Sequence, residues 1–158
     1  MNSVLPVMIG GAIGAGARHL VGQAMLARLG PGFPWWTLTI NIVGSLLMGL
    51  LIGALARGDG ISDTVRLFVG VGILGGFTTF SSFSMEFWML FERGQNAQAA
   101  AYILASVIGA IAACGLGLLG ILPNEQALGI FLHLVIHRRD GRCCALHRRH
   151  WQHRRCGA

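Results

Sequence analysis

The stretch from Gly75 to Ser84 carries the side chains best suited to bind a small ion. It reads GGFTTFSSFS, so glycines and hydroxyls alternate with three phenylalanines. An aromatic ring has a negative face and a positive edge, and its edge can face an anion. Backbone carbonyl and hydroxyl oxygens can bind a cation. Neutral groups of this kind hold an ion with the moderate strength that conduction through a pore requires.

The surrounding apolar run, Phe68 to Leu90, is long enough to cross a bilayer. Glycine destabilises a helix, and clustered hydroxyls compete for its backbone hydrogen bonds. The composition therefore predicts a transmembrane helix that is broken within residues 75–84. Irregular backbone at membrane depth is tolerated only where protein buries it or where it lines a cavity. A helix–helix contact made by small residues is the alternative interpretation.

Asn41 is a polar residue in a second apolar segment. Its amide offers two donors, and such a group inside a membrane needs a partner. One interpretation is a hydrogen bond to another helix, and the other is donation to an anion that has lost its water. Phe80 and Phe83 favour the second interpretation, because their ring edges could share the same ion.

The sequence contains no arrangement typical of an enzyme. Glu86 and Glu92 are the acids near the third apolar segment, and no His or Cys accompanies them in sequence. The glycine-rich run 11–16 lacks the Lys-Ser/Thr pair of a phosphate-binding loop, and no strand precedes it. We therefore expect a protein that is not an enzyme.

The composition indicates a membrane protein, because 54% of the residues are hydrophobic and only 11% are charged. Four apolar segments, each long enough for one crossing, predict an all-α integral membrane protein. Trp35 and Trp36 are expected to form an interfacial aromatic pair. The predicted membrane-spanning segments are Val4–Leu29, Thr37–Ala56, Val65–Phe91 and Ala97–Leu122.

Small residues recur at helical spacing, which predicts close helix packing and a packing surface that extends to another subunit. The arginines before residue 122 are divided between both predicted sides of the membrane. This weak bias permits insertion in both directions and hence an antiparallel dimer, although a single orientation stays open. The small-residue stripes are Gly10 and Gly14; Ser45, Gly49 and Gly53; and Ala105, Gly109, Ala113 and Gly117.

The tail, residues 123–158, has a different composition from the membrane domain, residues 1–122. It holds seven arginines, five histidines and three cysteines, and hence most of the net charge of +6. A zinc site is disfavoured because Cys143 and Cys144 are adjacent, which is not a usual ligand spacing. Binding of nucleic acid or anionic lipid has only the charge in its favour. We expect a disordered or out-of-frame segment, and no nucleic-acid partner.

Three motifs, taken together, resemble the Fluc/CrcB family of fluoride channels. They are Gly10-Gly11 through Arg18, the run from Asn41 to Ser45, and residues 75–84 followed by Glu86. The resemblance covers roughly residues 5–120. It implies four transmembrane helices, the third broken in mid-membrane, in an antiparallel dual-topology homodimer with two fluoride pores. A passive channel in the cell inner membrane or plasma membrane would let cytoplasmic fluoride leave the cell, with lipid as its surroundings.

The resemblance also implies a role for individual residues. The carbonyls of Gly75 and Thr78 would bind a structural Na⁺ at the dimer centre, shared with the second subunit. Arg18 would lie near a pore entrance. A polar stripe on the fourth helix would read Tyr102 and Ser106, followed by Ala110 and Cys114, which depart from hydroxyls. The fluoride pore would be lined by Asn41, Phe80, Ser81, Phe83, Tyr102 and Ser106.

Two other functions remain open from the residues. A small four-helix, proton-coupled drug exporter would need a membrane-embedded carboxylate on its first helix. The first segment contains no carboxylate and carries Arg18 instead, which disfavours this alternative. A membrane subunit that transports nothing and uses its glycine stripes to bind a partner is the other alternative.

Overall fold

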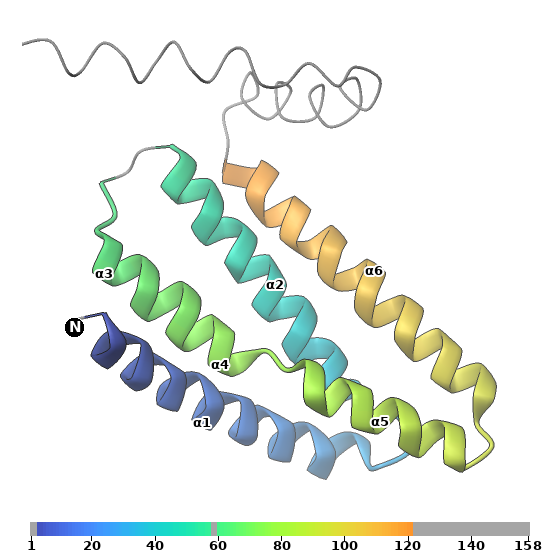
Figure 1. Ribbon diagram of the computed structural model, residues 1–158. Coiled ribbons are helices and arrows are strands. Elements are labelled where there is room, and N and C mark those ends of the chain that lie inside the picture. Colours follow the sequence, from blue (N-terminus) through green and yellow to red (C-terminus); the bar gives the residue numbers. More distant parts are fainter. Residues whose placement is uncertain (1–2, 58–59, 122–158) are drawn as a thin grey trace, which may run out of the picture. The chain divides into compact units, whose positions relative to one another are not determined.

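The computed structural model describes residues 3–57 and 60–121, so the predicted tail and Leu122 lie outside the described residues. Within that part of the chain, four helical spans are long and apolar enough to cross a membrane, as predicted (Figure 1). The observed and expected boundaries differ by two residues or fewer. The spans are α1 (Val4–Leu29), α2 (Trp35–Ala56), Asp63–Glu92, and α6 (Asn96–Ile121).

The third span is a series of shorter pieces, and Figure 1 shows the non-helical link between two of them. Thr78 and Thr79 have extended backbone angles, with ψ of 156° and 121°. The interruption therefore lies within the predicted stretch. The pieces are α3 (Asp63–Arg66), the π-helix η1 (Leu67–Leu74), α4 (Gly75–Phe77) and α5 (Phe80–Glu92).

Threonines, and not the glycines, form the break. Gly75 has ordinary helical angles (φ −64°, ψ −37°) and belongs to α4. The hydroxyl of Thr78 donates to the Leu74 carbonyl at 3.0 Å. The hydroxyl of Thr79 accepts from the Ser82 N–H at 3.2 Å and so caps the start of α5. The hydroxyls thus satisfy backbone groups on both sides of the link.

The glycines instead let helices approach one another closely. α1 packs along η1 and α4, and α2 packs along α6. A Cβ added at Gly14 would collide with the Ile73 carbonyl, and one at Gly76 would lie 2.6 Å from the Gly11 carbonyl oxygen. On the other pair, a Cβ at Gly49 would collide with the Cys114 carbonyl. The predicted packing role of small residues is confirmed at Gly14 and Gly49, although Ala105 is exposed.

Gly14→Ala should destabilise the protein, whereas Gly16→Ala on the same helix should not. Both changes add the same methyl group, but a Cβ at Gly16 has no atom within 4 Å. Overpacking at Gly14 should cost about 1–3 kcal/mol. Thermal unfolding of the detergent-purified variants measures the difference. Equal midpoints would contradict the packing role of Gly14.

Candidate functional site

A cavity of about 310 Å³ lies beside the break in the third span. Most of the predicted pore residues meet there, although they come from α2, the link, α5 and α6. The same cavity includes Thr78, so the expected anion and sodium groups are neighbours. The lining residues with polar or aromatic side chains are Asn41, Ser45, Thr78, Thr79, Phe80, Phe83 and Ser106.

The side chain of Asn41 forms two hydrogen bonds to the backbone of the link. Its Nδ2 donates to the Thr79 carbonyl at 3.0 Å, and the Thr79 N–H donates to its Oδ1 at 2.8 Å. The cross-helix hydrogen bond that the sequence left open is therefore present in the structure. An amide nitrogen has two hydrogens, so this pair of bonds uses only one of them. The other hydrogen belongs to a side chain that lines the cavity.

The Asn41 contact and the Thr79 cap remove the helical donors of two carbonyls. In a continuous helix, the Gly75 carbonyl would accept from the Thr79 N–H, four residues on. That N–H donates to Asn41 instead. The Thr78 carbonyl would likewise accept from the Ser82 N–H, which donates to the Thr79 hydroxyl. The two carbonyls predicted to bind sodium are thus among those that lose their α-helical donors at the break, together with Gly76 and Phe77.

The two predicted pore phenylalanines differ in their surroundings. Phe80 is 77% exposed in the single chain, whereas Phe83 is 8% exposed. Their ring centroids lie 5.3 Å apart, and that of Phe83 lies 5.2 Å from that of Tyr102. Tyr102 is fully buried. The aromatic rings therefore form a continuous series from the exposed edge of the cavity to the interior.

The serine hydroxyls at the site differ in burial and in hydrogen bonding. The buried Ser106 Oγ has no hydrogen-bond partner in the described structure, and such a group is costly unless something binds it. The exposed Ser81 lies outside the cavity lining, with its Oγ 3.2 Å from that of Thr79. Ala110 lines the cavity, and Cys114 does not. The polar stripe therefore reaches the cavity at Ser106.

A second cavity, of about 330 Å³, is lined by polar side chains of α1. Arg18 extends from it to the link, where Nη1 donates to the Thr78 carbonyl at 3.4 Å. His19 and Gln23 share this helix face with Arg18 and were not identified from the sequence. Their spacing, one helical turn apart in an apolar segment, was the available signal, since ionisable groups in membranes face cavities.

Glu86, which follows the third motif, is the other site residue for which the sequence predicted no role. Its carboxylate accepts hydrogen bonds from both α2 and α6. Oε1 accepts from Trp36 Nε1 and Thr37 Oγ1 of α2, both at 2.8 Å. Oε2 accepts from the Tyr102 hydroxyl at 2.6 Å. The Trp36 indole therefore points toward Glu86, whereas Trp35 is 47% exposed. Their expected position at the membrane interface stays a prediction. A lone carboxylate in an apolar span was the signal, because it requires donors.

Comparison with known proteins identifies relatives of this chain. Residues 5–118 match the family described as CrcB-like protein, Camphor Resistance (CrcB). A protein of Sphingopyxis alaskensis, named fluoride-specific ion channel FluC, is 75% identical over 119 residues. Proteins with the same name from Mesorhizobium japonicum and Caulobacter vibrioides are 58% and 51% identical. Each alignment covers 75% of this chain and 94% of the relative.

The match spans all four apolar helices and the motifs that line the cavities. Helices of this length and hydropathy, in a chain with ion-channel relatives, make it a multi-pass membrane protein. The similarity extends over most of each relative's length and is far above what a shared fold alone would produce. This chain belongs to the CrcB family.

Proposed function

We propose that this protein is a fluoride-specific ion channel through which cytoplasmic fluoride leaves the cell passively. The observation that carries the proposal is the cavity at the break, where an amide, two aromatic rings and an unpartnered hydroxyl converge. The names of the relatives support the same function. We do not expect the protein to be an enzyme.

Neutral donors would replace the water that fluoride loses. The second Nδ2 hydrogen of Asn41, the Ser106 hydroxyl and the ring edges of Phe80 and Phe83 can each face an anion. None carries a full charge, so the ion would be held weakly enough to move on. Arg18, in the neighbouring cavity, would raise the local anion concentration at the pore entrance. Ser81 and Tyr102 would extend the pathway.

Sodium is the cofactor that the family resemblance implies. The carbonyls of Gly75 and Thr78 fit it by donor type, because a hard cation takes oxygen ligands and both have lost helical partners. Arg18 also donates to the Thr78 carbonyl, which would then serve both groups with its two lone pairs. When bound, Na⁺ would compensate the carbonyl dipoles and join two subunits.

A second copy of the chain is part of the proposal. Two carbonyls from one chain are too few for an ion inside a membrane, but a two-fold axis would supply four. The exposed ring of Phe80 would then be covered by the partner or by lipid. We propose an antiparallel, dual-topology homodimer, with the third span of each subunit broken in mid-membrane and two fluoride pores.

Liposomes that contain the purified protein and a fluoride gradient test the function. We expect fast efflux at a fluoride electrode that is selective over chloride and independent of a proton gradient. Proton-coupled release of an organic cation would instead indicate an exporter. Absence of any flux would indicate a membrane subunit that transports nothing.

Phe80→Ile and Phe83→Ile should each reduce fluoride efflux by about tenfold or more while the dimer persists. Isoleucine keeps apolar bulk but has no polarised ring edge. Phe91→Ile is the matched control, because Phe91 also lies on α5 but lines neither of the two polar cavities. Size-exclusion chromatography monitors assembly. Unchanged efflux in the double variant would make both rings packing residues.

Asn41→Asp should reduce fluoride efflux by about a hundredfold or more, because an ionised carboxylate repels the anion and cannot donate. The aspartate would still accept from the Thr79 N–H, so part of the clamp on the link persists. Asn96→Asp, at the exposed start of α6, controls for added charge. Normal efflux with intact assembly would restrict Asn41 to its structural hydrogen bonds.

Exchange of sodium for a large organic cation should weaken the assembly. If Na⁺ binds the folded dimer, its removal should lower the melting temperature by about 5 °C or more. Thermal unfolding and size exclusion in N-methylglucamine, potassium and sodium buffers measure the effect. An identical midpoint in all three buffers would contradict a structural sodium ion.

A further inference from the structure

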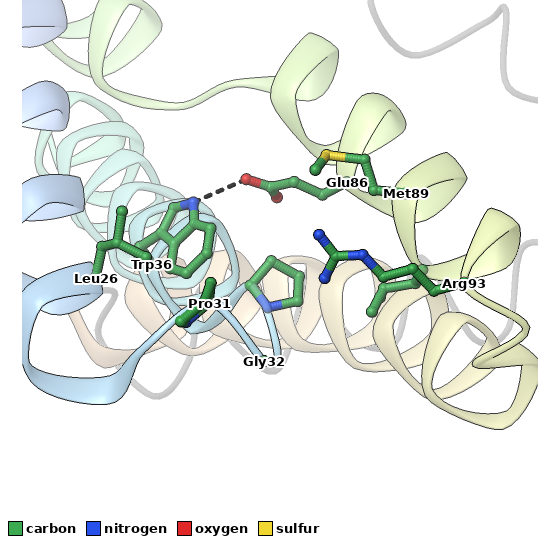
Figure 2. Close-up of a pocket in the computed structure, with 9 residues that line it drawn as sticks. Leu26, Pro31, Gly32, Trp36, Glu86, Met89 and Arg93 are labelled. Atoms are coloured by element: carbon green, nitrogen blue, oxygen red, sulfur yellow. Dashed lines mark hydrogen bonds between the residues drawn. The ribbon is translucent and has the colours of Figure 1, made fainter.

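Trp36 and Glu86 lie where two cavities adjoin. Together with Leu26, they line both the polar cavity beside α1 and a third cavity, of about 210 Å³. Figure 2 shows this third cavity, with the hydrogen bond from Trp36 to Glu86 on one side and Arg93 on another. The Trp36–Glu86 contact is therefore part of the wall between the two spaces.

The carboxylate of Glu86 is held by uncharged donors. Trp36 and Thr37 donate to one oxygen and Tyr102 donates to the other, so all three contacts suit an ionised, acceptor-only group. Trp36 and Thr37 are also the second and third residues of α2, whose positive helix end favours a negative charge.

The nearby charges do not replace these donors. Arg18 and His19 of α1 line the polar cavity, and Arg93, which follows α5, lines the third cavity. Within the part of the chain that the structure describes, the one ion pair joins Arg66 and Asp63. It lies at the opposite end of the third span from Glu86. The orientation of the Glu86 carboxylate therefore depends on its hydrogen bonds.

We propose that Trp36 is a positioning residue for anion permeation: its indole N–H holds the Glu86 carboxylate in the wall, so that the negative charge does not project into the fluoride path. The inference rests on the proposed function and deepens it. It concerns a residue that binds no fluoride itself and acts through Glu86. Without the indole N–H, the carboxylate would keep two of its three donors, Thr37 on Oε1 and Tyr102 on Oε2. It would then be less firmly held and could turn further into the polar cavity that it lines.

Trp36→Phe removes the N–H and keeps a large aromatic ring. We expect fluoride efflux to fall by about tenfold, the equivalent of one lost hydrogen bond to a charged group. Trp35→Phe is the matched control, because Trp35 is adjacent, more exposed, and lines none of these cavities. It should stay within about twofold of the wild type. Size exclusion verifies that both variants assemble.

A double-mutant cycle with Glu86→Gln separates positioning from packing. If Trp36 acts through the charge, Trp36→Phe should cost about tenfold with Glu86 present and less than about twofold in the Glu86→Gln background. Because the ratio within each background is compared, a lower absolute rate of the glutamine variant does not alter the result. Glu86→Ala provides a second neutral background if the glutamine variant conducts too slowly to measure.

A failure of the Trp36 proposal can be distinguished from a failure of the proposed channel function. Equal efflux of the Trp36 and Trp35 variants, or an equal loss in the glutamate and neutral backgrounds, would overturn the positioning role. In both cases the wild-type protein still conducts fluoride. A wild-type protein that conducts no fluoride would instead contradict the channel function itself.

Discussion

The pair of hydrogen bonds between Asn41 and the backbone of Thr79 is the contact on which the rest of the site depends. A bilayer offers no water to a broken helix, so every N–H and C=O at a break needs a protein partner. Asn41 supplies one donor and one acceptor from a single side chain. By taking the Thr79 N–H, it also withdraws that donor from the Gly75 carbonyl. One side chain thus stabilises the break and leaves a carbonyl available for an ion.

The polar side chains around the break have neutral hydrogen-bond partners, whereas the Thr78 carbonyl accepts from the Arg18 guanidinium. Asn41 and the threonine hydroxyls form hydrogen bonds with backbone groups. The Glu86 carboxylate accepts hydrogen bonds from an indole, an aliphatic hydroxyl and a phenol. The donors that line the cavity at the break are uncharged and would hold an anion weakly enough for release, whereas an unsatisfied carboxylate would repel it. The positive charge of Arg18 lies in the neighbouring cavity. An environment of uncharged donors is therefore compatible with both a stable membrane domain and anion passage.

Two kinds of interaction join the helices. Glycines bring α1 onto η1 and α4, and α2 onto α6, where backbone meets backbone without intervening side chains. Polar side chains join these two pairs: Asn41 and Glu86 each connect the third span to α2, and Glu86 connects it to α6 as well. Because the same groups line the cavities, changes in packing between the pairs would alter the site directly.

The sequence determined the four spans, their boundaries and the broken stretch, because length, hydropathy and helix propensity are local properties. The residue types also indicated Asn41, Phe80 and Phe83, and the family resemblance added Ser106. The fold brings all four into one cavity. The sequence placed the break among glycines and hydroxyls together. The structure places it at the two threonines, where local hydroxyl bonds and the tertiary contact of Asn41 satisfy the backbone, and leaves Gly75 and Gly76 helical. The inward turn of Trp36 toward Glu86 was likewise decided by tertiary structure, since the partners are 50 residues apart and only packing of α2 against α5 aligns donor and acceptor.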